Sequence, residues 1–127
     1  GVLIGAPGGH PDAAAGSKCC IIVTPLIRGR MATICEKVVT VATPGECVDV
    51  VVTDYGIAVN PLRKDIMEWL DKAKIPHVPI RALMEKAYSI TGYPEELQWE
   101  DKIVAIMEAR DGTILDVIRQ IKPYSFE

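Results

Sequence analysis

A glycine-rich stretch near the start of the chain has the clearest chemical use. Residues 5–10 read Gly-Ala-Pro-Gly-Gly-His and follow a short apolar run. Because Gly8 and Gly9 lack a Cβ, their backbone N–H groups are open to a ligand, and such a nest can hold an anion or a carbonyl oxygen that gains charge. The stretch matches neither a P-loop nor a dinucleotide fingerprint. A tight turn at the end of a strand explains the same residues, and the motif alone favours that simpler interpretation.

Two titratable residues follow the glycines. His10 and Asp12 could form an acid/base or orienting pair. Alternatively, Asp12 caps the short helical turn predicted for residues 11–16, and His10 is an ordinary loop residue. No metal site is expected, because the chain has only two histidines and no Cys-x-x-Cys motif.

Two further groups could bind a substrate. Arg28 and Arg30 flank a glycine in a basic loop, where guanidinium groups could bind carboxylates bidentately. Solvated surface arginines explain them equally well. Asp54 and Tyr55 follow a strand predicted for residues 48–53, and open α/β sheets bind ligands at the carboxyl ends of their strands. The alternative is a polar strand end with Tyr55 packed on the sheet.

The elements that must position these residues alternate between strands and helices. Asn60-Pro61 predicts a helix start, Pro76 its end, and Gly92 the C-cap of a second helix. Loops are predicted at residues 5–10 and 54–58. The predicted strands cover residues 2–4, 19–24, 32–35, 38–42, 48–53 and 77–80, and the second helix covers residues 81–91.

A β-hairpin is predicted at the end of the chain. Residues 102–110 and 113–121 are joined by Asp111-Gly112, a type I′ turn signal that places Ile106 opposite Val117 and Ala105 opposite Ile118. Both faces then carry apolar side chains, so we expect the hairpin to pack against the main sheet or a partner.

Composition limits the class of protein. The 127 residues are 49% apolar and 24% charged, enough for a single domain over residues 1–127 with an α/β fold and a core of aliphatic side chains. A net charge of -3 without a basic cluster argues against nucleic-acid binding. No apolar run has the length of a membrane span and no signal peptide is evident, so we expect a cytoplasmic protein. The four cysteines are then expected to be small buried side chains in a reducing compartment.

The chain resembles the C-terminal portion of the citrate lyase alpha subunit family in four segments that follow in the same order. A more distant resemblance, to acetyl-CoA hydrolases and transferases, is weakened because His10 replaces a glutamine and Asp54 a glutamate of that pattern. The four segments are GAPGGHPDAAAGSK, CIIVTPLIRGR, TPGECVDVVVTDYGIAVNP and RDGTILDVIRQI.

The resemblance implies a fold and an activity. The fold would be CoA-transferase-like (NagB/RpiA-like), a mostly parallel sheet with flanking helices and a C-terminal hairpin. The activity would be that of a citrate CoA-transferase of the 2.8.3 type: citrate replaces acetyl on an acyl carrier protein thioester, which gives citryl carrier protein and acetate. The partners would be the beta subunit and the gamma subunit, whose CoA-like prosthetic group carries the thioester, in an oligomer. This chain would need no cofactor of its own.

The resemblance also implies roles for residues. Gly8 and Gly9 would donate to the thioester carbonyl, with His10 and Asp12 lining the same pocket. The arginines of the basic loop would bind the carboxylates of citrate. The family's complete subunit is several times longer, so this chain is expected to be a fragment that does not catalyse alone.

Two alternatives stay open: a transferase or hydrolase of the same fold that uses free CoA, and a non-catalytic module that binds the CoA-like arm or assists assembly. The substrate-binding candidates are Arg28, Arg30, Asp54 and Tyr55.

Overall fold

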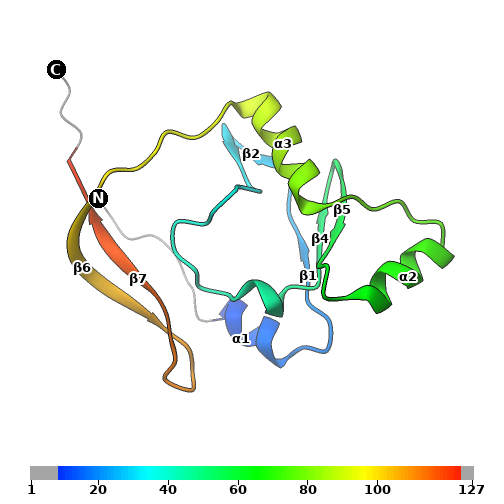
Figure 1. Cartoon of the computed structure of the whole chain (residues 1–127), viewed down its shortest axis with the longest axis horizontal. Helices are drawn as coiled ribbons and strands as arrows, with labels where there is room; N and C mark the ends of the chain where they lie inside the picture. The colour runs from blue at the N-terminus through cyan, green and yellow to red at the C-terminus, as the bar shows by residue number, and fades with distance from the viewer. Residues whose placement is uncertain (1–8, 124–127) are drawn as a thin grey trace.

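A computed structural model describes residues 9–123 of the chain. The strand predicted for residues 2–4, the first part of the glycine-rich stretch and Gly8 lie outside the described residues. The described elements form a central α/β part and a separate β-hairpin that lies at one end of the molecule (Figure 1).

The main sheet has three strands: β1 (Ile21–Val23), β4 (Val50–Thr53) and β5 (Gly56–Val59), in the order β1-β4-β5. Strand β1 pairs with β4 in parallel and β4 with β5 antiparallel. The strand predicted at residues 48–53 is therefore confirmed, but the loop predicted at residues 54–58 is wrong, because Asp54-Tyr55 is a two-residue turn into β5. The sheet is mixed within the described residues, not mostly parallel as predicted.

Strand β1 is shorter and more exposed than predicted. The apolar run at residues 19–24 suggested a strand buried on both faces, yet the side chains of Ile21 and Val23 are 56% and 77% exposed, because β1 is an edge strand of the described sheet. The cysteines also differ from the prediction. Cys19 and Cys35 are exposed, Cys20 and Cys47 are half-buried, and all four are free thiols.

The segment between β1 and β4 contains little regular structure. Strands β2 (Ile27–Arg28) and β3 (Met31–Ala32) form a small hairpin around Gly29, which has a φ of 62°. The strands predicted at residues 32–35 and 38–42 do not form. Side chains from distant elements bind this stretch instead, because its backbone donors have no strand partner. The Glu36 N–H donates to the Tyr88 hydroxyl at 3.0 Å and the Val41 N–H to an Asp116 carboxylate oxygen at 2.8 Å.

Two helices follow the main sheet, α2 (Lys64–Lys72) and α3 (Ile80–Thr91). Helix α2 begins later than predicted because the Asn60 carboxamide holds a turn: its oxygen accepts from the Leu62 N–H, and its nitrogen donates to the carbonyls of Gly45 and Val48. The Gly92 C-cap of α3 is confirmed, with a φ of 76°.

The strand predicted at residues 77–80 is wrong. The Val78 N–H donates to the Ile57 carbonyl at 2.8 Å, but α3 begins at Ile80, so the segment is too short to pair further. Helix α3 then packs on the strands through Leu83 and Ala87, whereas Ile90, predicted to lie on the same buried stripe, is exposed.

The buried core consists of two small clusters, and each cluster packs one helix against the main sheet. One cluster joins α3 to β5 and the segment before β2, and the other joins α2 to β4 and β5. The first contains Leu26, Ala58, Leu83 and Ala87, and the second Val50, Val59 and Ile66.

The C-terminal hairpin consists of β6 (Trp99–Glu108) and β7 (Ile114–Ile121), which pair only with each other among the described strands. The predicted pairs of Ile106 with Val117 and of Ala105 with Ile118 are confirmed. The turn is not type I′, because only Gly112 has a positive φ (86°) and that turn needs two such residues. The Gly112 N–H donates to the Ala109 carbonyl at 3.0 Å. A register shift between Met107 and Glu108, beside the turn, gives the strands the predicted pairing.

Candidate functional site

The glycine-rich stretch leads into a helix rather than a loop. Helix α1 (Gly9–Gly16) begins at Gly9, so the N–H of this residue is one of those that find no acceptor within the helix. No described atom lies within 4 Å of the place where a Cβ at Gly9 would project. Gly9 therefore places a backbone donor at the positive end of a helix, with open space beside it.

His10 and Asp12 do not pair with each other. The His10 Nδ1 lies 2.7 Å from the Thr43 hydroxyl oxygen in a hydrogen bond. The Asp12 carboxylate accepts two hydrogen bonds from the Arg110 guanidinium, at 2.7 and 2.5 Å. These bonds hold the pKa of Asp12 below its usual value. Asp12 is therefore an anion held by an arginine from the distant hairpin, and it is not poised to accept a proton.

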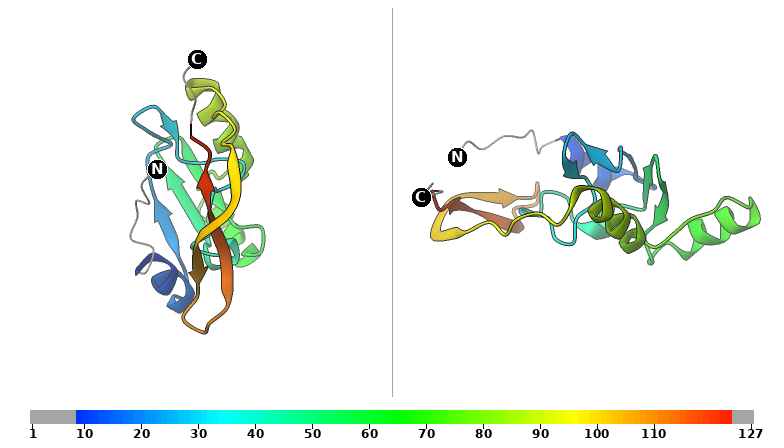
Figure 2. Two further views of the ribbon diagram at one scale, coloured as in Figure 1. Left: turned by 90° about the vertical axis from the view of Figure 1, so that its left-hand side faces the viewer. Right: turned by 90° about the horizontal axis from the view of Figure 1, so that it is seen from above.

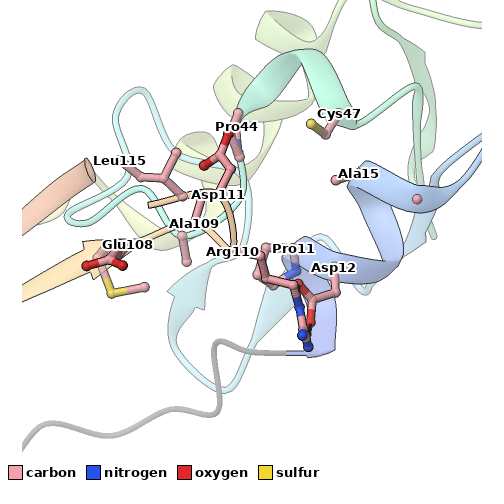
Figure 3. Close-up of a pocket in the computed structure, with 13 residues that line it drawn as sticks. Pro11, Asp12, Ala15, Pro44, Cys47, Glu108, Ala109, Arg110, Asp111 and Leu115 are labelled. Carbon is pink, nitrogen blue, oxygen red and sulfur yellow. Dashed lines mark hydrogen bonds and ion pairs between the residues drawn. The ribbon is translucent and has the colours of Figure 1, made fainter. Parts of the chain in front are cut away.

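A pocket of about 780 Å³ lies between α1, the short 3₁₀ helix η1 (Gly45–Cys47) and the hairpin turn (Figure 3). Asp12 and Arg110 face each other at one side of it, and the other walls are mainly apolar. His10 lines a different hollow, beside β1. The apolar walls of the larger pocket come from Pro11, Ala15, Pro44, Met107 and Leu115.

The remaining candidates form a second group. The Leu26 N–H donates to the Asp54 carboxylate at 2.7 Å, which ties the end of β4 to the start of β2. Tyr55 is exposed, and the Lys86 ammonium lies 5.5 Å from the centre of its ring. Arg28 and Arg30 are exposed beside this turn, and within the described part of the chain neither forms an ion pair. Lys86 is therefore the cation that contacts this turn, and Arg28 and Arg30 lie in the loop that begins just after Leu26.

The two groups lie at opposite ends of the main sheet. Helix α1 lies at the end where β1 begins, whereas β2 and the turn between β4 and β5 lie at the other end (Figure 1). The structure thus brings Asp54 and Tyr55 near the loop that carries Arg28 and Arg30. All four residues lie away from Gly9, His10 and Asp12.

One cluster of charges was missed in the sequence. The Arg63 guanidinium donates to Asp49 at 2.6 Å and to both carboxylate oxygens of Asp65 at 2.9 and 2.8 Å, and Asp49 also accepts from the Cys20 N–H at 2.7 Å. The Cys20 and Arg63 bonds lower the pKa of Asp49, and Arg63 lowers the pKa of Asp65 to about 2. Asp49 is only 8% exposed. Its place in the apolar run Val-Asp-Val-Val-Val was the available signal, because a buried carboxylate needs a partner.

The described residues lack two further kinds of site. Residues 9–123 contain no group of three or more histidine, cysteine or acidic side chains arranged to hold a metal ion. Among the same residues, no helix combines the length and the apolar character needed to cross a bilayer.

Comparison with known proteins gives one consistent family. A family model described as citrate lyase, alpha subunit, matches residues 1–121. Citrate lyase alpha chains of Haemophilus influenzae and Klebsiella pneumoniae are 52% and 51% identical over 122 residues, which cover 96% of this chain and 24% of each relative. A Streptococcus mutans crystal structure, assigned as an alpha subunit of citrate lyase in complex with citrate, is 49% identical with a TM-score of 0.91, over 96% of this chain and 24% of that one. The chain therefore spans about a quarter of the length of the relatives that it matches.

Proposed function

The chain belongs to the citrate lyase alpha subunit family, and from this membership we propose that it forms part of an acyltransferase that exchanges acetyl for citrate on an acyl carrier protein thioester. The products are citryl carrier protein and acetate, as in a citrate CoA-transferase. The partners in this proposal are the beta subunit and the gamma subunit, which carries the CoA-like arm, in a cytoplasmic oligomer. This chain supplies no cofactor.

The observation that carries the proposal is the colinear match to the family over residues 1–121 at about half identity. The S. mutans relative, which aligns over 96% of this chain, is described as bound to citrate, which supports citrate as the carboxylate substrate. We extend the proposal to a CoA-transferase-like fold for the complete subunit, with β1 and β4 in a larger, mostly parallel sheet. The parallel pairing of β1 with β4 is consistent with that fold.

We assign the reacting thioester carbonyl to the glycine end of the sheet. Exchange between a carboxylate and a thioester builds negative charge on oxygen, which fixed N–H donors stabilise without reorganisation. Gly9 offers such a donor at the start of α1, with open space beside it. His10 and Asp12 then border the approach, and Gly8, outside the described residues, is the second donor in this proposal.

The arginine end needs a separate role because it lies across the sheet. Arg28, Arg30 and Lys86 offer positive charge to the carboxylates of citrate, with Asp54 and Tyr55 beside them. A single citrate bound there would not reach Gly9 of the same chain. Substrate binding at this end therefore requires another part of the complete subunit, or a second subunit, to bring the two groups together.

Variants of Gly9 test the assignment in a complete alpha subunit that carries this sequence. Proline at position 9 removes the N–H, yet the first helical residue is the position where a helix tolerates proline. Alanine keeps the N–H and adds only a methyl group in the open space. Loss of one oxyanion donor typically lowers turnover on the order of a hundredfold or more. We therefore expect Gly9→Pro to lose acetyl exchange and Gly9→Ala to lose less, with both proteins folded.

Gly16→Ala is the matched control, since Gly16 ends the same helix and also has open space beside it. The measurement is isotope exchange between labelled acetate and acetyl carrier protein, with circular dichroism as the folding check. A folded Gly9→Pro subunit that exchanges at the wild-type rate contradicts the assignment. Activity on free CoA thioesters in place of the carrier protein would favour a CoA-dependent transferase or hydrolase, and thioester binding without turnover would favour a non-catalytic module.

A further inference from the structure

The β6–β7 hairpin exposes apolar side chains along β6 and at the start of β7. In the view from its own side, both strands lie in front, with no described element over them (Figure 2, left). Its only described strand pairing is internal. An isolated two-stranded hairpin is marginal in water, and three strands or packing against a helix are needed for stability. The exposed residues are Trp99 at 37%, Ile103 at 52%, Val104 at 53%, Ile106 at 55% and Ile114 at 61%.

The described body covers the hairpin only in part. Asp116 accepts from the Val41 N–H, and Arg110 binds Asp12, so the contacts lie along one side and at the turn. These contacts, and the pocket that Met107 and Leu115 share with α1, leave Ile103, Val104 and Ile106 exposed. The hairpin therefore needs a further apolar surface.

The surface area of the chain points the same way. A compact protein of 13.9 kDa should expose about 6,700 Å², whereas the whole chain exposes 9751 Å². Among the described residues, the hairpin and β1 expose large apolar side chains.

We infer that the exposed face of the β6–β7 hairpin is an internal interface, which packs on the part of the complete alpha subunit that this chain does not include. The matching relatives are about four times as long as the matched region, so three quarters of such a polypeptide is available to cover it. A covalently linked segment also has a much higher effective concentration than a separate partner. This inference rests on family membership and the apolar face, and it does not depend on the proposed transfer reaction.

Site-specific labelling in the complete alpha subunit tests the inference. Ile106→Cys and Ile114→Cys place a thiol in the proposed interface, and Lys72→Cys places one on the exposed end of α2. Each variant is treated with a maleimide, natively and in denaturant, and labelling is quantified at that peptide by mass spectrometry. We expect Ile106→Cys or Ile114→Cys to react at least tenfold more slowly in the native subunit than in the denatured one, and Lys72→Cys to react at similar rates in both.

The same experiment separates the possible occupants. Protection in a subunit shown by light scattering to be monomeric supports the inference. Protection that appears only on dimerisation, or only after the other citrate lyase subunits are added, overturns it in favour of an interface between chains. Free labelling at both hairpin positions in the folded subunit also overturns it. Because the readout is labelling and not turnover, its outcome is independent of the Gly9 result.

Discussion

Arg30 is an exposed residue whose role a single substitution can decide. If its guanidinium binds a citrate carboxylate in the complete subunit, Arg30→Ala removes a charge-assisted hydrogen bond, which typically contributes about 1.5–3 kcal/mol. The citrate concentration for half-maximal exchange should then rise roughly tenfold or more, since each 1.4 kcal/mol is about a factor of ten. The thioester requirement should change little. Initial exchange rates over a range of citrate and carrier protein concentrations measure both.

Arg81→Ala is the control, because Arg81 is an exposed arginine whose ion pair among residues 9–123 is with Glu85 on its own helix. It should leave both requirements unchanged. Equal weakening of citrate and thioester by Arg30→Ala would indicate a structural loop, and no change would indicate a solvated side chain.

Individual site residues show what sequence spacing can and cannot predict. Spacing along the chain suggested that Asp12 either pairs with His10 or caps the helical turn after it, but its partner is Arg110, which is 98 positions away. Asp54 likewise binds the distant Leu26 N–H. The sequence identifies which side chains are polar, and its turn and cap residues indicate where a helix or strand ends. It does not identify the partner, because the partner is chosen by how distant elements pack.

At the scale of elements, local signals were reliable where the local sequence determines the geometry. Gly92 ends α3 as predicted, because a positive φ there favours glycine. The pairs Ile106–Val117 and Ala105–Ile118 of the terminal hairpin were also predicted correctly, although the turn is not the predicted type I′ and a register shift between Met107 and Glu108 compensates for the difference. Burial was not predictable from the same residues. The apolar run around Ile21 to Val23 looks like a buried strand, yet Ile21 and Val23 are exposed, because no described element covers the face on which they lie.

Arg63 joins three elements, and its ion pairs should make stability depend on pH. It binds Asp49 at the start of β4 and Asp65 in the first turn of α2, and it donates to the Lys18 carbonyl before β1. The pKa of Asp65 is about 2 when folded, below its usual value of 3.8. A lowered carboxyl pKa adds stability that is complete above the usual pKa and is lost as pH falls through the folded pKa.

We therefore expect the wild-type melting temperature to fall steeply between pH 4 and pH 2. Asp65→Asn should melt lower than wild type at pH 6, and the difference should shrink over that acidic range and at high salt. Glu68→Gln, an exposed change on the same helix, is the control. A difference that stays constant from pH 6 to pH 2 would mean that the Asp65 carboxylate contributes nothing through its charge.

At the scale of the whole molecule, the described hairpin shares no strand pairing with the central part and contacts it through hydrogen bonds and the walls of a shared pocket. The central part has its own small core, whereas the hairpin lies at one end and α2 at the other (Figure 2, right). The sequence predicted one domain, since the apolar content is sufficient for a single core. Among the described residues, the apolar side chains do not all reach that core: Val23, Trp69 and Ile114 are exposed.

The ion pair between Asp12 and Arg110 joins the hairpin turn to α1 and should limit how freely the hairpin moves against the central part. Arg110 is 84% exposed at its side chain, so salt and acid should both weaken the pair. The pKa of Asp12 is lowered mainly by its hydrogen bond to Arg110, so the pair should be intact above the usual carboxyl pKa of 3.8 and should be lost as pH falls through the lowered pKa of the folded state. In the complete subunit, Arg110→Asp and Asp12→Arg alone should each speed amide hydrogen exchange near the turn by about two- to fivefold. The charge-swapped double variant should recover much of the protection, whereas Lys102→Ala, an exposed change on β6, should have no effect.

If the double variant exchanges as fast as the sum of the two single effects predicts, the pair does not hold the hairpin to α1. The pocket between them would then be shaped by apolar packing alone.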